Sequence, residues 1–302
     1  MSKDIPHYRG RFAPSPTGPL HFGSLIAAVA SYCQARRMQG NWLVRIEDVD
    51  ETRTVPGSAD DILRTLDNYG FEWDGEVLYQ TQRKPAYEEA LQQLLSSDLI
   101  YRCICSRKDL QEQAKQGELG FIYPGLCASK HYPENTQSAL RIRTQDQLIE
   151  FEDQIMGLYG QNLKQQLGDF IVRRRDGLFA YQLAVVVDDE FQQITEIIRG
   201  SDLLDSTPRQ IYLQQQLNYS TPAYAHHPVA INQQGDKLSK QTGALAIHAN
   251  ASVASLVSVM NFLGQCPESG LEKASLNTFW QWAMEFWDLN KVPETQKILY
   301  TN

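Results

Sequence analysis

The hydrophobic and polar positions of the first hundred residues follow two alternating patterns. Short apolar runs predict strands at Arg9–Ala13, Trp42–Ile46 and Ile100–Cys103. Apolar residues at helical spacing predict helices from His21 to about Met38, from Ser58 over Leu66, and over Tyr87–Leu95. An order of strand, helix, strand and helix is typical of a parallel, doubly wound sheet, so we predict an α/β fold of Rossmann type. The ligand site of such a sheet lies beyond the carboxyl ends of its strands.

The remaining chain begins with an interruption of this pattern. Residues 103–135 are rich in cysteine, glycine, proline and charged residues, which indicates a small insertion. After it, the pattern predicts strands at Ala139–Arg143, Phe170–Arg173, Ala180–Val187 and Ile194–Ile198. A helix is predicted at about Pro208–Leu217, and a polar loop at Gly235–Gly243. Two further apolar stripes, at Val253–Leu263 and Phe279–Trp287, predict a short helical C-terminal region.

The charge balance limits the kind of nucleic-acid partner that the chain can have. Its 302 residues include 28 Lys and Arg against 36 Asp and Glu, a formal net charge of −8. A protein that coats nucleic acid without specificity is strongly basic, so that class is excluded, whereas a nucleic-acid enzyme with a local basic patch is not. The longest apolar stretches are far shorter than the ~20 residues that span a bilayer, and the N-terminus lacks a secretory signal. We therefore expect a cytoplasmic monomer with no membrane partner.

The first chemical motif is a turn rich in proline and glycine, Pro14–Pro19, between the first strand and the first helix. A helix N-terminus offers free backbone N–H groups and a partial positive charge, which suit a phosphate group. Gly23 lets a nucleotide approach the backbone, while His21 and Ser24 can donate to phosphate oxygens. The alternative is an ordinary strand–turn–helix connection without a ligand.

The second motif is the polar segment Gly235–Gln241, in which Lys237 and Lys240 bracket Ser239. Lysines of this kind can neutralise the charge that develops when pyrophosphate leaves, although a lone motif of this type is usually a solvated loop. Together the two motifs resemble the His-Ile-Gly-His and Lys-Met-Ser-Lys-Ser signatures of class I aminoacyl-tRNA synthetases. The sequence departs from those signatures at Phe22, Ser24, Leu238 and Gln241.

Several longer segments resemble the glutamyl branch of that class. They are Arg11–Gly18, Leu43–Asp48, Tyr181–Ala184, Val186–Asp189, Ile198–Leu204 and Thr207–Gln210. The resemblance covers roughly residues 9–245. The chain beyond Lys240 has room for a few helices only, and Ser201–Ser206 also matches the shorter paralogues better. The chain therefore resembles the glutamyl-Q tRNA(Asp) synthetase family, which lacks the anticodon-binding domain of the full glutamyl-tRNA synthetases.

The resemblance implies a role for each matching residue. Arg11 and Arg199 contact glutamate, whose side-chain carboxylate suits a planar guanidinium. Glu47 binds the α-ammonium, Tyr181 completes the pocket with its hydroxyl, and Ser15 touches the substrate. His21, Gly23, Ser24 and Lys240 bind ATP; Lys240 is the main catalytic lysine, with Lys237 secondary and His21 assisting. Without the resemblance, a structural ion pair between Arg11 and Glu47 across adjacent strands is the favoured interpretation, because paired charges are more often structural.

A metal site is indicated by three cysteines that lie close together in the sequence, Cys103, Cys105 and Cys127. An odd total of five cysteines does not suit a disulfide framework, whereas zinc favours four thiolate or imidazole ligands. Chemistry alone nominates His131 as the fourth ligand, while the family resemblance implies Tyr123. The alternative is three reduced cysteines in a loop. We expect one structural Zn²⁺ here, and Mg²⁺ accompanying ATP without a dedicated protein cage.

These expectations combine into a domain plan. Residues 1–102 form the first half of a nucleotide-binding catalytic domain, 103–168 an inserted acceptor-type subdomain with the zinc site, 169–240 the second half, and 241–302 a short helical tail. The implied reaction forms glutamyl-adenylate from ATP and L-glutamate without tRNA, and then transfers glutamate to queuosine at the wobble position of tRNA(Asp). The alternatives are a glutamyl-tRNA synthetase that charges the 3′ end of tRNA(Glu), and a non-catalytic, synthetase-like RNA-binding module.

The RNA partner is expected to be the anticodon stem-loop that contains queuosine. Arg173–Arg175 form a basic run that can meet RNA phosphates, together with Arg107, Lys108 and Lys130. The alternative for this run is a solvated charged edge. Trp280, Trp282 and Trp287 can stack on bases, but hydrophobic packing of the last helices is the favoured interpretation.

Overall fold

The centre of the fold is a parallel sheet. A computed structural model describes residues 7–238 and 252–300. Strands β1 (Arg9–Phe12), β2 (Asn41–Ile46) and β3 (Leu78–Tyr79) pair in parallel, as do β11 (Glu196–Gly200) and β12 (Ala223–His227). The start of β11 lies beside β1, where the Thr195 N–H donates to the Arg9 carbonyl at 3.0 Å. The predicted α/β architecture with a parallel sheet is therefore confirmed.

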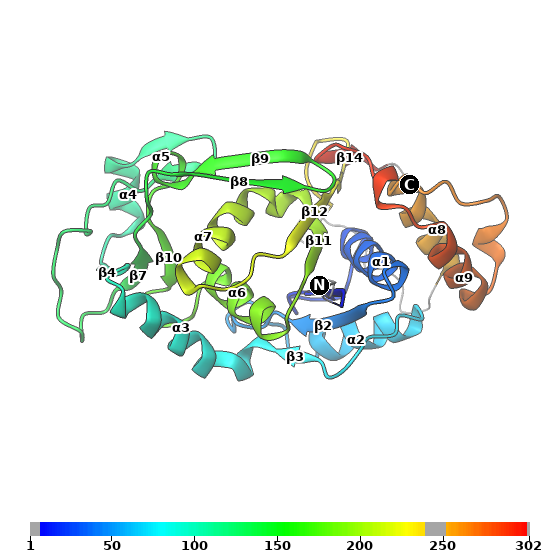
Figure 1. Cartoon of the computed structure of the whole chain (residues 1–302), viewed down its shortest axis with the longest axis horizontal. Helices are drawn as coiled ribbons and strands as arrows, with labels where there is room; N and C mark the ends of the chain where they lie inside the picture. Colours follow the sequence, from blue (N-terminus) through cyan, green and yellow to red (C-terminus); the bar gives the residue numbers. More distant parts are fainter. Residues whose placement is uncertain (1–6, 239–251, 301–302) are drawn as a thin grey trace, which may run out of the picture.

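Helices cover both faces of this sheet because successive strand residues point to opposite sides. In β11, Ile198 packs into the core beneath α1 (Phe22–Arg37), while Ile197 packs into the core formed by α3 (Lys84–Ser96), α6 (Tyr181–Phe191) and α7 (Thr207–Leu217). Ala225 and Tyr224 of β12 divide between the same two cores. Figure 1 shows α1 on one side of β11 and β12, and α6 and α7 on the other.

The strand predicted at Ala180–Val187 is wrong, because this segment forms helix α6, Tyr181–Phe191. Leu183, Ala184, Val185, Val186 and Val187 are all buried there. A helix that is buried on every side has the same uninterrupted apolar pattern as a buried strand, and periodicity does not separate the two. The other predicted strands and helices lie within a few residues of the elements that the structure describes.

Antiparallel strands extend the fold between its two halves. Strands β4 (Ile100–Cys103), β7 (Ala139–Ile142) and β10 (Phe170–Arg173) form one sheet, and β8 (Leu148–Asp153) and β9 (Gly157–Asn162) form a hairpin that the sequence did not predict. The shorter elements of this region are α4 (Arg107–Gln113), β5 (Lys115–Gly117), β6 (Gly120–Ile122) and α5 (Leu163–Gln166). The sheet joins residues on both sides of the predicted boundaries at 103 and 168, so the domain division stays a prediction.

The C-terminal helices pack against α1. Helices α8 (Val253–Phe262) and α9 (Leu276–Phe286) contact it at the opposite end of the molecule from α4 and α5 (Figure 1). Trp280 and Trp287 are buried and donate through their indole N–H groups to the Tyr69 carbonyl and the Gln34 side chain, each at 2.9 Å. Trp280 and Trp287 therefore pack in the hydrophobic core, which is the interpretation that the sequence favoured.

The remaining elements are α2 (Ser58–Asn68), β13 (Val229–Ile231) and β14 (Lys297–Leu299). No helix in the described ranges is long and apolar enough to cross a membrane.

Candidate active site

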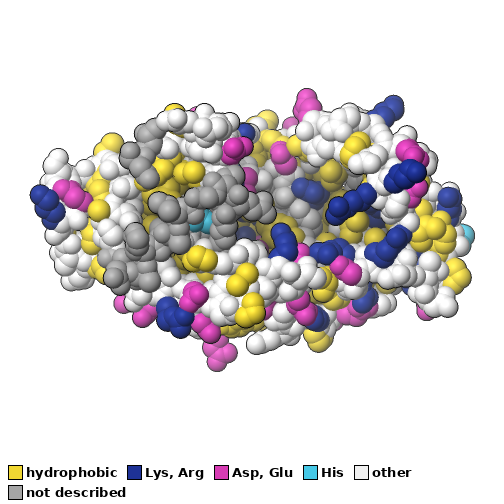
Figure 2. All heavy atoms as spheres, turned by 180° about the vertical axis from the view of Figure 1, so that it is seen from behind, with side chains coloured by type: hydrophobic (Ala, Val, Ile, Leu, Met, Phe, Trp, Pro, Cys, Tyr) yellow, Lys and Arg dark blue, Asp and Glu magenta, His cyan; other side chains and the backbone are white. Residues whose placement is uncertain are grey.

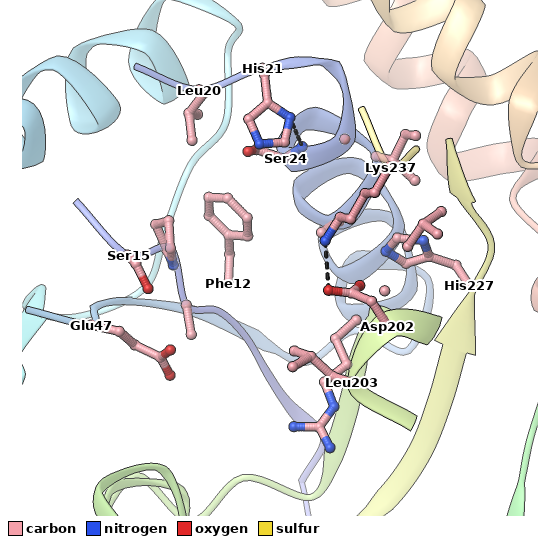
Figure 3. Close-up of a pocket in the computed structure, with 18 of the residues that line it drawn as sticks. Phe12, Ser15, Leu20, His21, Ser24, Glu47, Asp202, Leu203, His227 and Lys237 are labelled. Carbon is pink, nitrogen blue, oxygen red and sulfur yellow. Dashed lines mark hydrogen bonds and ion pairs between the residues drawn. The ribbon is translucent and has the colours of Figure 1, made fainter. Parts of the chain in front are cut away.

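A cavity of about 650 Å³ opens at the carboxyl ends of β1, β2 and β11, which is the position that the sheet topology predicts. Figure 3 shows side chains from both halves of the chain converging on it. The predicted site residues that line this cavity are Arg11, Ser15, His21, Gly23, Ser24, Glu47, Tyr181, Arg199 and Lys237. Lys240 and Ser239 lie outside the described residues. The structure thus gathers into one cavity residues that are distant in sequence.

One end of the cavity is formed by the N-terminus of α1. His21 is the N-cap residue, and its ring nitrogen Nδ1 accepts a hydrogen bond from the Ser24 N–H at 3.3 Å (Figure 3). A Cβ atom at Gly23 would lie 3.3 Å from the carbonyl oxygen of Leu238. The absence of a side chain at Gly23 therefore lets the N-terminal turn approach the late loop closely, and this places Lys237 at the same end of the cavity.

Lys237 is held by an acidic partner at this end. Its Nζ lies 2.6 Å from Oδ2 of Asp202, which belongs to the turn after β11, and both side chains are partly exposed (Figure 3). A helix N-terminus and a lysine ammonium together favour an anionic ligand. The geometry therefore suits phosphate groups at this end of the cavity.

The opposite end contains a buried cluster of charges. Asp189 Oδ1 lies 3.1 Å from Nε of Arg11 and 2.8 Å from an NH2 nitrogen of Arg45, whereas Glu47 lies 3.5 Å from Arg45. Burial raises the pKa of Asp189, but the two guanidinium groups outweigh it and hold this pKa below its usual value. The simple ion pair between Arg11 and Glu47, which was the structural alternative, is replaced by a four-residue network centred on Asp189.

Glu47 is the group in this cluster that is open to a further cation. Burial raises the pKa of Glu47, and the neighbouring Arg45 and Arg11 only partly offset that effect. A cationic ligand group in the cavity would favour the ionised carboxylate. Tyr181, the first residue of α6, lies near Glu47, and burial followed by the charge of Glu47 raises the pKa of its hydroxyl. That hydroxyl therefore stays protonated and can donate a hydrogen bond.

Arg199 lies in β11 and is buried, with 5% of its surface exposed. Its Nε donates to Nε2 of His226 at 3.0 Å, and its NH2 group donates to Oγ1 of Thr207 at 2.9 Å. Its NH1 nitrogen is buried and has no hydrogen-bond partner in the part of the chain that the structure describes. A buried donor without a partner is costly, so this guanidinium edge is suited to an acceptor from a ligand.

The site includes residues to which the sequence assigned no role. Asp189 lies in a segment that carried the family resemblance, and Thr207 begins another, but neither was a site candidate. Arg45, Asp153 and His226 were also not selected. Arg45 also lies in a matching segment, Leu43–Asp48, whereas Asp153 and His226 are brought together by contacts between distant strands, for which a single sequence offers no local signal.

The three clustered cysteines come together away from this cavity. The sulfur atoms of Cys103, Cys105 and Cys127 all lie within 4.8 Å of one another. The Tyr123 hydroxyl is 3.3 Å from the Cys103 sulfur and 3.7 Å from that of Cys105, while His131 does not belong to the cluster. Although burial opposes it, hydrogen bonds with the Ile104 backbone and neighbouring side chains lower the pKa of Cys127 to about 7. Three thiols and a phenol at these distances fit a tetrahedral metal such as zinc.

Comparison with known proteins defines the class of this fold and site. The family model described as "tRNA synthetases class I (E and Q), catalytic domain" matches residues 7–264. The solved structure of a glutamate–tRNA synthetase from Elizabethkingia anophelis superposes with a TM-score of 0.79 at 26% identity, covering 97% of this chain and 68% of that one. The fold is therefore that of a class I aminoacyl-tRNA synthetase catalytic domain, and the protein is an enzyme of the ligase type.

More similar relatives narrow the assignment. A glutamyl-Q tRNA(Asp) synthetase from Dechloromonas aromatica (strain RCB) is 52% identical over 294 residues, with 97% of this chain and 98% of the relative covered. One from Neisseria meningitidis serogroup A is 51% identical over 292 residues, with 95% and 98% covered. The chain belongs to the glutamyl-Q tRNA(Asp) synthetase family.

Proposed function

We propose that this protein activates L-glutamate with ATP in the absence of tRNA, and then transfers glutamate to queuosine in the anticodon loop of tRNA(Asp). The observation that carries the first step is the polarity of the active-site cavity. One end offers the buried guanidinium of Arg199 beside the carboxylate of Glu47, and the other offers the α1 N-terminus beside Lys237. An amino acid with an acidic side chain fits the first end, and a triphosphate fits the second.

Glutamate is oriented by charge. The free NH1 edge of Arg199 binds the side-chain carboxylate, and Arg11 supports the same negative charge. Glu47 binds the α-ammonium, and the Tyr181 hydroxyl donates to the substrate. Ser15 lines the cavity between the two ends and contacts the bound substrate. This arrangement points the α-carboxylate of glutamate toward the nucleotide.

The adenylation step then needs positioning rather than a protein nucleophile. An oxygen of the α-carboxylate attacks the α-phosphorus of ATP, the bond from that phosphorus to the bridging oxygen breaks, and pyrophosphate leaves with the electron pair. His21, Gly23 and Ser24 hold the phosphates at the α1 N-terminus, and Lys237 neutralises the charge that develops on pyrophosphate. We assign Lys240 the main catalytic role, and Mg²⁺ supplies further charge neutralisation as it accompanies ATP.

The transfer step requires that RNA reach the same cavity. A hydroxyl oxygen of the queuosine cyclopentene-diol attacks the carbonyl carbon of the adenylate, AMP leaves, and an ester forms with release of one proton. A second groove, about 450 Å³ in volume, is lined by Arg102, Arg173, Arg174 and Arg175 together with Glu88 and Glu134. Lys and Arg side chains gather in the half of the molecule that carries the insertion (Figure 2). We assign this groove to the phosphates of the anticodon stem.

Asp50 lies between the active-site cavity and the second groove, which we call the basic groove. Its Oδ2 lies 2.7 Å from Nε of Arg53, which lines the active-site cavity, and 3.0 Å from NH1 of Arg174, which lines the basic groove. An RNA backbone in the basic groove would therefore lie close to the entrance of the cavity. This proximity supports the assignment of the anticodon stem-loop as the RNA partner.

The experiment that tests this function offers radiolabelled glutamate to tRNA(Asp) with and without queuosine. We expect label only on the queuosine-containing tRNA, and transfer that weakens with rising salt, because phosphate contacts release counterions. Exchange of pyrophosphate into ATP with glutamate alone should proceed without tRNA. Equal labelling of both tRNAs would contradict the proposed acceptor, labelling of tRNA(Glu) would favour the glutamyl-tRNA synthetase alternative, and absence of exchange would favour a binding module.

We also propose that Cys103, Cys105, Tyr123 and Cys127 hold one structural Zn²⁺, which stiffens the inserted segment near the RNA. The purified protein should contain about one zinc per chain. Replacing Cys105 by serine should reduce this to below about 0.2, because a thiolate ligand is lost. Replacing Cys266, which is exposed and lies outside the cluster, should leave the metal content unchanged. Metal analysis of the three proteins checks this, and a wild type with fewer than about 0.2 zinc per chain would count against the site.

A further inference from the structure

A buried chain of hydrogen bonds leads from the hairpin β8–β9 to Arg199. Strand β12 lies between β11 and β8, and its register places His226 directly beside Arg199. His226 Nδ1 lies 2.5 Å from Oδ2 of Asp153, the last residue of β8, and its Nε2 lies 3.0 Å from Nε of Arg199. The side chains of Asp153 and His226 are both completely buried.

The hydrogen-bonding chemistry of these groups determines the tautomer of His226. The Nε of an arginine can only donate, so Nε2 of His226 must accept, and the ring proton must be on Nδ1. Nδ1–H then donates to the Asp153 carboxylate, whose other oxygen accepts from the backbone N–H groups of His226, Ile155 and Met156 at 3.0, 3.1 and 2.9 Å. Burial lowers the pKa of His226 to about 4, which agrees with a neutral imidazole at neutral pH.

This chain fixes the orientation of a planar group. His226 holds the Nε of Arg199, and Thr207 holds its NH2 group at 2.9 Å. Because a guanidinium is planar, two fixed donors also fix the third, and the third is the buried NH1 nitrogen that lacks a partner among the described residues. Arg45, Arg141 and Arg209 also each have a buried Nε without a partner among the described residues, but of these four arginines only Arg199 lines the active-site cavity.

We infer that Asp153 and His226 are positioning residues, which hold Arg199 so that its NH1 edge meets the side-chain carboxylate of the amino-acid substrate. This inference rests on the proposed function, since it deepens the assignment of Arg199 to glutamate. The device also contributes to specificity, because a rigid donor edge suits a carboxylate, whereas a mobile arginine can turn toward water or toward the amide of glutamine.

Two variants separate positioning from general stability. Asp153→Asn keeps the size of the side chain but can present an N–H to Nδ1, which favours the opposite tautomer and turns Nε2 into a donor facing the Nε–H of Arg199. His226→Leu removes the acceptor, whereas His226→Gln keeps a carbonyl oxygen that can replace Nε2. Gln154→Ala is the matched control, because Gln154 adjoins Asp153 but is exposed and bonds to Glu196.

The measurement is ATP–pyrophosphate exchange with glutamate and ATP varied separately, accompanied by titration calorimetry with glutamate. We expect the KM for glutamate to rise about tenfold or more in Asp153→Asn and His226→Leu, with the KM for ATP within about twofold of wild type. His226→Gln should recover most of the loss, and the preference for glutamate over glutamine should fall in the two impaired variants. Gln154→Ala should behave as wild type.

The inference is overturned if the folded Asp153→Asn and His226→Leu proteins bind glutamate as wild type does, or if both KM values rise together. If His226→Leu does not fold, the KM values for glutamate and for ATP in Asp153→Asn and His226→Gln provide the same test. If Arg199→Ala lost activity while Asp153→Asn kept a normal KM for glutamate, Arg199 would keep its role in binding glutamate, and only the positioning role of Asp153 and His226 would be refuted. Absence of glutamate-dependent exchange in the wild type would overturn the proposed function and this inference with it.

Discussion

Replacing Arg199 by alanine is expected to reduce glutamate-dependent ATP–pyrophosphate exchange by a factor of about 1,000 or more in kcat/KM. The side chain contributes a buried guanidinium whose NH1 edge is free for the substrate, while His226 and Thr207 hold the rest of it. Loss of a buried, charge-assisted contact to a carboxylate costs about 4 kcal/mol, which corresponds to roughly three orders of magnitude in rate. The measurement is steady-state exchange at varied glutamate concentration.

Arg199→Lys provides a stricter version of the same test. Lysine keeps the positive charge but lacks the planar fork, so we expect most of the loss to remain. Arg64→Ala is the control, because Arg64 is highly exposed and pairs with Asp61 on the surface of α2. If a folded Arg199→Ala protein retained kcat/KM within about threefold of wild type, Arg199 would have no role in binding glutamate.

Replacing Asp189 by alanine is expected to lower the free energy of unfolding by about 3–5 kcal/mol, so that many preparations of the variant would contain little folded protein. Asp189 is the carboxylate that both Arg11 and Arg45 share, at 3.1 and 2.8 Å, and all three side chains are almost completely buried. Without it, two guanidinium groups remain in the interior, where Glu47 and the neighbouring Asp188 offset their charge only in part. Urea unfolding at neutral pH gives the change in the free energy of unfolding.

Two further variants identify the cause of this loss. Asp189→Asn keeps the shape but removes the charge, so it should lose most of the same stability and also displace Arg11. Asp176→Ala removes a carboxylate that pairs with Arg174 at 2.6 Å but is 46% exposed, so its cost should be about 0–1 kcal/mol. Equal effects of Asp189→Ala and Asp176→Ala would show that burial of the charge network is not what stabilises this part of the fold.

Local patterns predicted most helices and strands well. The apolar stripe of α1, its start near His21 and the short strands β1, β2, β4 and β10 follow from side-chain periodicity and turn residues, which act over a few positions. The errors have the same local origin. The segment Leu183–Val187 of helix α6 is entirely apolar because it is buried between the sheet and two helices, and the hairpin β8–β9 carries exposed and charged residues on one face. Neither pattern distinguishes strand from helix without its neighbours.

The candidate site, too, was predicted from the sequence only in part. Motif resemblance nominated Arg11, Glu47, Tyr181 and Arg199, and the structure brings all four to one cavity. The choice of Tyr123 over His131 also came from resemblance, and in the structure the phenol lies within the cysteine cluster whereas His131 does not. The late lysine loop is described only as far as Leu238, so the role of Lys240 stays a prediction.

By itself, the sequence determined most of the helices and strands, the two motifs that carry the family resemblance, and four of the side chains that line the cavity, Arg11, Glu47, Tyr181 and Arg199. Only the tertiary structure decided how those side chains are paired. Asp189 joins Arg11 to Arg45, and Asp153 orients His226 and through it Arg199, across strands that are far apart in the chain. The physical reason is that burial gives charged groups their energetic importance, and which charges share a buried space depends on strand register and packing, which no local pattern encodes.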